Sequence, residues 1–302
     1  MVNNSRKHLV LVKLAIGLAL ILALILSWRN LPAEGAGSYR LFLPVVTKAA
    51  LPDDGMVLVP AGEFQMGCDE SNPNESCLSS ELPLHTVRLD AFRIHKYEVT
   101  NEQYARFLND RGSNICGGKK CMEFESSYSR IALQSGQYVV ENGYKDHPVI
   151  EVSWFGGRSY CTESGERLPS EAEWEKAARG SSDTRLYAWG NQPADCTRTN
   201  FNNDGFCVGD TAPVGSYPSG ASPYGVFDMT GNVWELVNDW YDRDYYDVTP
   251  DANPPGPASG TRKVIRGGSW YNSWNHIRIA IRASNDPTDT VYVVGFRCAS
   301  TP

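Results

Sequence analysis

The stretch that decides the fold of this chain covers residues 225–235 and reads GVFDMTGNVWE. Asp228 and Glu235 flank a turn that contains Gly231. A turned backbone exposes carbonyl oxygens and two carboxylates add negative charge, which suits calcium because this ion takes about six to eight oxygen ligands. The spacing is not that of an EF-hand loop. The simpler alternative is a helix start with Asp228 as its cap and Glu235 on the surface, and spacing alone favours this alternative.

The region around this stretch is poor in regular periodicity. From Arg179 onward the helical pattern fades, and residues 180–260 are rich in Gly, Pro, Asn, Asp and aromatic residues. A loop-rich stretch of this length needs disulfides or metals to hold it. Residues 200–206 (NFNNDGF) pose the same choice between a calcium site and an ordinary turn, and the ordinary turn is again favoured.

Aromatic residues crowd the same region. We expect most of them in the core, because aromatic side chains supply much of the burial in a domain poor in regular structure. The alternative is a groove that grips a peptide or a sugar. The candidate lining of that groove is Trp234, Trp240, Trp270, Tyr271 and Trp274.

The rest of the chain shows clearer elements. Apolar patterning predicts strands at 56–60, 64–66, 86–89, 92–94, 264–270 and 295–298. A helix is expected over 101–110, with Thr100 as N-cap and Gln103 completing a capping box. A second helix is expected to follow Ser153 and to run to Ser164, ending at Gly165. A third is expected after Pro169, with Ser170 as its cap and Glu173 completing the box.

Length and composition restrict the class of protein. The chain has 302 residues, of which 41% are hydrophobic, and a formal charge of −7. This apolar content excludes a disordered protein, and the acidic balance argues against a nucleic-acid partner. No repeat indicates a solenoid. The common hydrolase, phosphate-loop and zinc-protease motifs are missing from the sequence, and the five histidines are scattered. His276 stands alone in a late loop, where a solvated residue is a simpler interpretation than a proton-transfer group.

The N-terminus has the pattern of a targeting segment. Basic residues precede a mostly aliphatic run over 14–27, which is typical of a secretory signal or a signal anchor. We therefore expect residues 1–36 to be a signal peptide or membrane anchor, 37–54 a linker, and 55–302 the folded domain. On this interpretation the protein is extracytoplasmic, and only the N-terminal segment would contact a membrane.

The cysteines agree with export, because their number, eight, is even and none lies in residues 1–36. Short spacings pair three sets of neighbours around loops, which leaves one long-range pair. No CxxC pair is present, so structural zinc is disfavoured. The expected bridges are Cys68–Cys77, Cys116–Cys121, Cys196–Cys207 and Cys161–Cys298.

Seven motifs in order carry a resemblance to a known family. They are YEVTNEQYARF (97–107), PVIEVSW (148–154), RLPSEAEWE (167–175), WGN (189–191), GVFDMTGNVWE (225–235), RGGSW (266–270) and GFRC (295–298). From about 55 to 300 the chain resembles the sulfatase-modifying factor family, whose members include formylglycine-generating enzymes. The resemblance implies one α+β domain of low regular secondary structure, related to the C-type-lectin-like fold and stapled by disulfides. It also supports the Cys161–Cys298 bridge.

The resemblance further implies calcium. One family site matches Asp228, Gly231, Val233 and Glu235, with side-chain ligands at the two acids and carbonyls between them. A second site matches Asn200, Phe201, Asp204 and Phe206. Extra residues precede Thr211, so Asp210 is an alternative to Asp204.

One departure from the family concerns copper. The family's copper oxidases carry two cysteines after the RGGSW motif, but here Asn272 stands in the first place and no cysteine lies between Trp270 and Cys298. Copper(I) prefers soft thiolate ligands, so a copper centre is not expected. Ser269 matches a family active-site position but supports no redox chemistry alone.

Two classes of function remain from the sequence. The first is a calcium-stabilised, non-catalytic module that binds a peptide, protein or glycan through the aromatic groove. The second is an enzyme of different chemistry, such as a divergent maturation factor, with Ser269, His276 and Arg278 as the residues to suspect. Generation of formylglycine from a substrate cysteine is a third alternative.

Overall fold

The computed structural model describes residues 55–302. The expected signal or anchor (1–36) and linker (37–54) lie outside the described residues. Residues 55–302 belong to one compact unit. Within 55–302, no helix has the length and apolar character that a membrane crossing requires.

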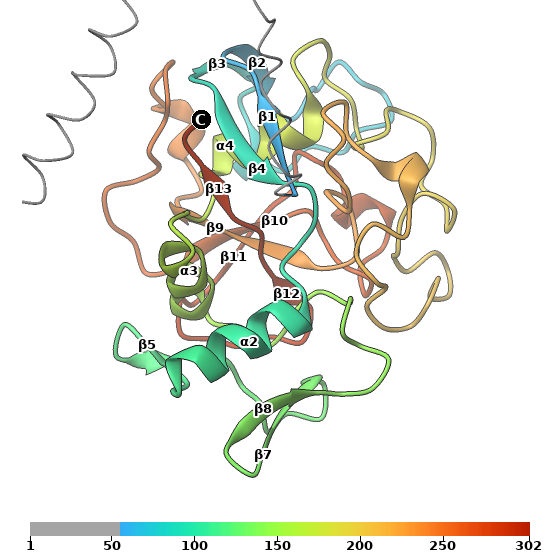
Figure 1. Ribbon diagram of the computed structural model, residues 1–302. Coiled ribbons are helices and arrows are strands. Elements are labelled where there is room, and N and C mark those ends of the chain that lie inside the picture. Colours follow the sequence, from blue (N-terminus) through green and yellow to red (C-terminus); the bar gives the residue numbers. More distant parts are fainter. Residues whose placement is uncertain (1–54) are drawn as a thin grey trace, which may run out of the picture. The chain divides into compact units, whose positions relative to one another are not determined.

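The first strands follow the predicted pattern. β1 (Met56–Val59) pairs antiparallel with β4 (Phe92–His95), and β4 also pairs with β13 (Ala299–Ser300) near the C-terminus. β2 (Gly62–Met66) and β3 (His85–Leu89) form a separate antiparallel pair. β4 thus joins the start of the folded domain to its end (Figure 1).

The three predicted helices are present, and their caps are as expected. α2 (Asn101–Arg111) and α4 (Glu171–Arg179) each begin with a reciprocal capping box, at Thr100 and Ser170 respectively. α3 (Trp154–Glu163) begins after Ser153, whose hydroxyl accepts a hydrogen bond from the Gly156 amide. These boundaries were predictable because a cap depends only on residues three positions apart.

The central sheet corrects the sequence-based expectation. Its strand order is β11–β10–β9–β12, with β9 (Trp234–Trp240), β10 (Lys263–Arg266), β11 (Arg282–Asn285) and β12 (Val294–Gly295). The favoured helix start at residues 228–235 is wrong, because Trp234 opens strand β9 and Glu235 is fully buried. Asp228 has φ 57°, a left-handed conformation that the extended N-cap position does not adopt.

The late strands are also shorter than predicted. β10 ends at Arg266 because Gly267 and Gly268 follow with φ of 93° and 72°, outside the strand region. Of the predicted strand at 295–298 only Gly295 lies in a strand, at the end of β12, and β13 begins just after it at Ala299.

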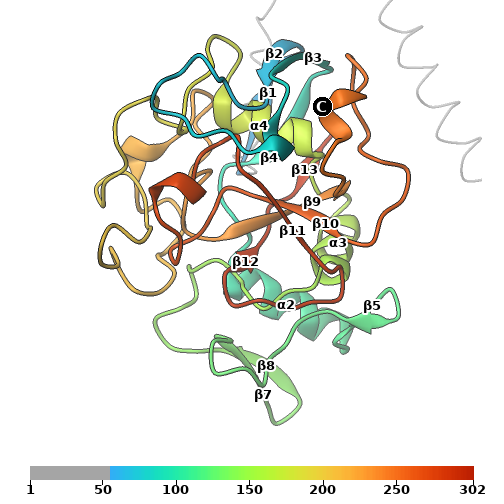
Figure 2. The same ribbon diagram turned by 180° about the vertical axis from the view of Figure 1, so that it is seen from behind.

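Several small elements were not predicted. Two hairpins are formed by β5 (Ile115–Cys116) with β6 (Lys119–Lys120) and by β7 (Ile131–Gln134) with β8 (Gln137–Val140). The β7–β8 hairpin projects beside α2 in both views (Figure 1, Figure 2). Single 3-10 turns are η2 (Ser79–Glu81), η3 (Pro218–Gly220), η4 (Tyr245–Asp247) and η5 (Trp274–His276).

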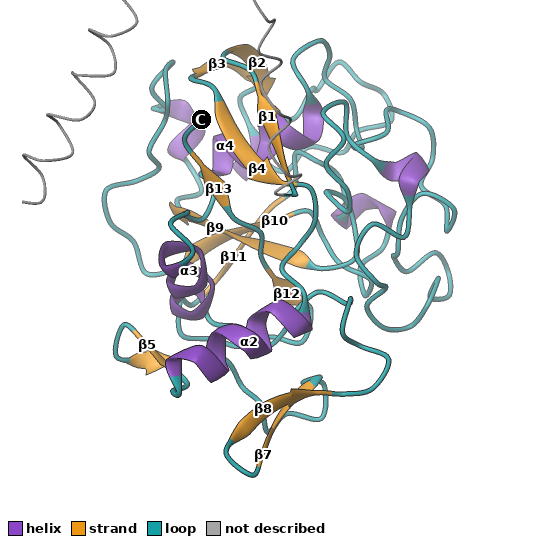
Figure 3. Cartoon of the chain, in the orientation of Figure 1, coloured by secondary structure: helices purple, strands orange, loops and turns teal. Residues whose placement is uncertain are grey.

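Loops and disulfides complete the domain. Figure 3 shows that long loops connect the few regular elements on one side of the domain. All four expected bridges are present: Cys68–Cys77, Cys116–Cys121, Cys161–Cys298 and Cys196–Cys207. One buried apolar cluster lies around α2, α3 and the central sheet, and a second lies around α4, β1 and β4. A smaller third cluster joins Leu186, Tyr187, Phe201 and Ile277 among the loops. The described domain is therefore α+β, held by these apolar clusters and four disulfides.

Candidate functional site

The stretch 225–235 forms a tight, buried turn that leads into β9. Asp228, Gly231 and Asn232 all have positive φ. Gly231 is required at its position, because a Cβ there would collide with the Thr199 hydroxyl and the Asn200 carbonyl. The turn therefore packs residues 199–200 directly against residues 230–232.

Acidic groups concentrate beneath this turn. Glu235 forms a buried ion pair with Arg297, with Nε–Oε2 and Nη2–Oε1 distances of 2.6 and 2.7 Å. Trp174 Nε1 donates to the same carboxylate at 3.0 Å. Glu98 is also buried, and Asn232 Nδ2 donates to its two oxygens at 3.3 and 3.1 Å.

The electrostatics of this cluster are unbalanced. Burial, reinforced by the charges of Asp228 and Glu235, raises the pKa of Glu98 well above its usual value. Burial likewise raises the pKa of Asp228 to about 6. Three buried carboxyl groups thus share one guanidinium, that of Arg297, and such an excess of negative charge is costly without a further cation.

The first predicted calcium site lies at this cluster. Its four ligand residues are all buried. Within residues 55–302, however, no three His, Cys, Asp or Glu side chains gather as metal ligands. The buried negative charge fits a divalent cation, and calcium here stays a prediction.

The residues of the second predicted site lie on one folded-back segment, since the Cys207 amide donates to the Phe201 carbonyl at 3.1 Å, and calcium here stays a prediction. Asn200 is buried, and among the described residues its Oδ1 has no hydrogen-bond partner, which suits an oxygen ligand. Asp204 is exposed on a turn, and Phe206 is about half exposed. Asn200 Nδ2 donates to the main-chain carbonyl of Asp210, the alternative acid, at 2.8 Å. The Asp210 carboxylate itself pairs with Arg130.

Asn272 stands at the position where the resemblance to the family's copper oxidases would place a cysteine, and its side-chain oxygen has hydrogen-bond partners within the protein. Asn272 Oδ1 accepts hydrogen bonds from the Ser269 amide at 3.1 Å, the Ser269 hydroxyl at 2.7 Å and Trp234 Nε1 at 2.9 Å. All eight cysteines of the chain are paired with each other. The donor set around Ser269 contains no thiolate and does not fit copper(I).

The two other suspected catalytic residues differ in exposure. His276 is exposed in η5, where its Nδ1 lies 3.4 Å from the Ser273 hydroxyl. Arg278 is buried and pairs with Glu81 (3.0 and 2.9 Å) and Glu75 (3.2 Å). The whole Arg278 guanidinium is therefore used inside the protein, and its role in this structure is to join segments.

The five aromatic residues of the predicted groove do not form one surface. Trp234 and Trp270 are buried, whereas Tyr271 and Trp274 are half exposed. Trp240 contacts the ammonium of Lys263 at 3.6 Å and stacks on Trp154. Trp234 and Trp240 lie about 20 Å apart along β9, since a strand rises ~3.3 Å per residue.

Two separate aromatic features replace that groove. Trp270 and Tyr271 pack with Phe206, and Tyr292 joins them. Trp274 instead borders a cavity of about 610 Å³ together with Tyr187 and residues of the 73–74 and 191–203 loops.

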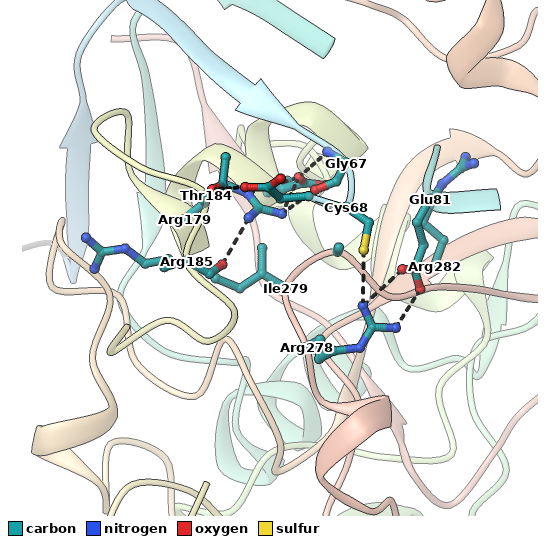
Figure 4. Close-up of polar contacts among 12 residues, drawn as sticks. Gly67, Cys68, Glu81, Arg179, Thr184, Arg185, Arg278, Ile279 and Arg282 are labelled. Carbon is teal, nitrogen blue, oxygen red and sulfur yellow. Dashed lines mark hydrogen bonds and ion pairs between the residues drawn. The ribbon is translucent and has the colours of Figure 1, made fainter. Parts of the chain in front are cut away.

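Sequence reasoning missed a network of buried arginines. Glu171 accepts hydrogen bonds from both Arg266 and Arg282, and Glu175 accepts from Arg179 and Arg266. Figure 4 shows Arg179 near Gly67 and Thr184, and Arg278 reaching toward Cys68 and Glu81. Arg266 lies in the RGGSW motif and Glu171 in RLPSEAEWE, so the motifs contained these residues, although nothing in them revealed the pairing.

Comparison with known proteins agrees with this architecture. Residues 43–302 match the family described as sulfatase-modifying factor enzyme 1-like domain. The chain is 39% identical over 250 residues to the serine/threonine-protein kinase pkn1 of Chlamydia pneumoniae, covering 81% of this chain and 37% of that protein. The chain thus spans little more than a third of that relative's length.

Two further similarities cover nearly the whole length of the similar protein. The chain is 34% identical over 291 residues to the formylglycine-generating enzyme of Thermomonospora curvata, covering 82% of this chain and 94% of that enzyme. The solved structure of PvdO from Pseudomonas aeruginosa has a TM-score of 0.63 at 26% identity, covering 82% of this chain and 94% of that one. The chain therefore belongs to the family of sulfatase-modifying factor enzyme 1-like domains.

Proposed function

We propose that this protein is an exported, calcium-stabilised and non-catalytic member of its family that binds a peptide or glycan. The observation that carries the proposal is the chemistry around Ser269. Asn272 occupies the place of the first copper cysteine, and its side-chain oxygen is saturated by three donors. No cysteine is left as a free thiol, so copper(I) has no thiolate to bind.

Calcium is part of the proposal because of the buried acidic cluster. Asp228 and Glu235 would supply carboxylate oxygens, and Gly231 and Val233 would supply carbonyls. When bound, calcium would offset the charge that Glu98 adds to the cluster. At the second site, Asn200 and Phe201 would act with either Asp210 or the turn containing Asp204 and Phe206.

The proposed location follows from the disulfides. Four bridges in a family of this kind indicate an oxidising compartment, either extracytoplasmic or the lumen of the endoplasmic reticulum. The finer proposal is that residues 1–36 direct export, as a cleaved signal or as a retained anchor, and that 37–54 link this segment to the domain.

A second candidate is a formylglycine-generating oxidase or another oxidative modifying enzyme of the family. The 34% identity to the Thermomonospora curvata enzyme favours it. The missing cysteine pair argues against it. Without thiolate ligands the protein would not hold copper(I), and without copper it would lack the metal that activates dioxygen. An enzyme of different chemistry, such as a divergent maturation factor, would have to rely on Ser269 or His276, because the Arg278 guanidinium is used within the protein.

Metal content separates these candidates. We would offer copper(I) and calcium to the oxidised full-length chain, desalt it and measure bound metal. The proposal expects retained calcium and no stoichiometric copper. In parallel, a cysteine-containing peptide is incubated with the protein, oxygen and a reductant, and aldehyde formation is followed by mass spectrometry. Stoichiometric copper together with aldehyde would overturn the proposal and favour the oxidase.

A pair of variants tests the calcium component. Asp228→Ala should lower the calcium retained by the chain. Asp289→Asn removes an exposed carboxylate that belongs to neither predicted calcium site and should leave calcium retention unchanged. Equal calcium retention in the two variants would contradict the assignment of Asp228 as a ligand.

A further inference from the structure

A cavity of about 610 Å³ opens beside Trp274, outside the buried turn described above. Loops from four parts of the chain meet there, at residues 73–74, 186–194, 203 and 274. We propose that this cavity binds an uncharged carbohydrate. The inference rests on the proposed function of the chain as a binding module, and it names the class of ligand.

The cavity lining is polar but carries no charge. Not one of its nine lining residues is charged, although 21% of the residues in the chain are Asp, Glu, Lys or Arg. Its polar groups include the amides of Asn74, Asn191 and Asn203. An amide both donates and accepts hydrogen bonds, as a sugar hydroxyl does. A charged ligand would find no counter-charge here and would lose hydration on entry.

Two of these amides are available for a ligand. The side chains of Asn74 and Asn203 are exposed and make no hydrogen bond with another residue in the described part of the chain. Asn191 is partly committed, since its Oδ1 accepts from the Leu186 amide at 2.8 Å. The cavity therefore offers free donors and acceptors on more than one wall.

An aromatic face completes the lining. Trp274 is 50% exposed, which is unusual for so large an apolar side chain. Tyr187 also lines the cavity and is held in place by stacking on Trp189, with ring centroids 4.8 Å apart. The negative face of an aromatic ring attracts the polarised C–H groups that one side of a pyranose ring presents.

The walls of the cavity are fixed before any ligand binds. Cys68–Cys77 closes the loop that carries Asn74, and Cys196–Cys207 closes the loop that carries Asn203. A rigid site loses less conformational entropy on binding than a mobile one does. Two of the four disulfides thus support the same cavity.

Buried polar contacts tie these loops to the Trp274 segment. Arg278 donates to the Glu75 carboxylate at 3.2 Å and to the Asn275 carbonyl at 2.9 Å, which joins the neighbours of Asn74 and Trp274 (Figure 4 shows Arg278). Tyr187 donates from its hydroxyl to the Trp274 carbonyl at 3.3 Å. Arg278 is therefore a positioning residue for the cavity.

A carbohydrate fits this cavity better than an extended peptide does. A peptide that binds as an added strand needs an exposed sheet edge, and every lining residue here lies in a loop or in η5. A compact cavity with amides on several walls and one aromatic face suits one or two sugar rings. Peptide binding is retained below as an alternative outcome.

The test uses the full-length chain on an array of neutral oligosaccharides, uronic-acid and sulfated oligosaccharides, and unmodified peptides. We expect binding to neutral oligosaccharides above the acidic ones. For the best neutral probe, Trp274→Ala should weaken binding at least tenfold by calorimetry. Tyr128→Ala is the matched control, because Tyr128 is an aromatic residue of similar exposure, 46%, outside the cavity and outside every predicted site, and it should change the affinity less than twofold.

A second variant keeps the cavity but changes its charge. Asn203→Asp should weaken the neutral probe several-fold while preserving the fold, which is checked by its circular dichroism spectrum. Neutral-glycan binding that survives Trp274→Ala would reject this cavity as the site. Binding to peptides alone, or to acidic glycans alone, would reject the ligand class but leave the binding-module function standing. Stoichiometric copper with peptide oxidation would reject that function itself.

Discussion

Asp239 on β9 provides the sharpest test of the electrostatics of this fold. It is only 4% exposed, and its Oδ2 accepts a hydrogen bond from the Glu171 amide at 2.9 Å. Burial, together with the charges of Glu171 and Glu173, raises the pKa of Asp239 to about 7, against the opposing effect of Lys263. The perturbation is Asp239→Asn, which keeps the shape and an acceptor but removes the ionisable group.

The sign and size of the effect follow from proton binding. Between about pH 4 and pH 7 the folded protein keeps the Asp239 proton and the unfolded chain has released it, so the stability of the wild type falls as the pH rises. A shift of about three pKa units at 1.36 kcal/mol per unit gives an upper value of about 4 kcal/mol above pH 7. Asp239→Asn should therefore unfold with a free energy about 2–4 kcal/mol higher than the wild type at pH 8.5, and about 1 kcal/mol higher at pH 4.5.

The assay is urea unfolding with intact disulfides at several pH values from 4.5 to 8.5. Asp289→Asn, at an exposed carboxylate, should differ from the wild type by less than about 0.5 kcal/mol throughout. A difference between Asp239→Asn and the wild type that does not change with pH would refute the reasoning. So would a variant that is less stable than the wild type at pH 8.5.

Three further predictions concern stability. Replacing both Cys161 and Cys298 by Ala should lower the free energy of unfolding by about 4–5 kcal/mol, because their disulfide closes a loop with a sequence separation of 137. Urea midpoints measured with and without reductant would check this. Arg282→Met should lower the free energy of unfolding by about 3–5 kcal/mol, measured by thermal or urea unfolding, because it removes an ion-pair partner of the buried Glu171 carboxylate. Replacing the exposed Arg106 in the same way should lower it by less than about 0.5 kcal/mol. Thr100→Ala should cost about 1 kcal/mol, because it removes the hydroxyl that caps α2, and Thr288→Ala in an exposed loop serves as its comparison.

The sequence-based prediction succeeded where the interactions are local. Thr100 and Ser170 marked the starts of α2 and α4, because their capping partners lie three residues away. It failed for β9, where Trp234, Glu235, Leu236 and Val237 are buried on both faces between helices and neighbouring strands. A strand covered on both faces shows no alternation of polar and apolar residues. Glu235 also argued against a buried strand, because a charged side chain is expected there only if it has an ion-pair partner, and its partner Arg297 is known only from the structure.

The candidate site was predictable only in part. The position of Ser269 and the substitution of the copper cysteine by Asn272 are visible in the residue order alone. The aromatic groove was not predictable, because whether Trp234, Trp270 or Trp274 reaches solvent depends on which loops cover each ring. The cavity beside Trp274 likewise depends on loops separated by more than a hundred residues.

The sequence by itself determined the family, the four disulfides, the helix boundaries and the lack of a thiolate pair, because each depends on residue type, order or short spacing. The tertiary structure alone decided which charges are buried together and which aromatic rings remain exposed. Glu171 and Arg282 are 111 residues apart and become an ion pair only when α4 packs beside the central sheet. Such contacts arise from long-range packing, where the burial of one segment sets the environment of another.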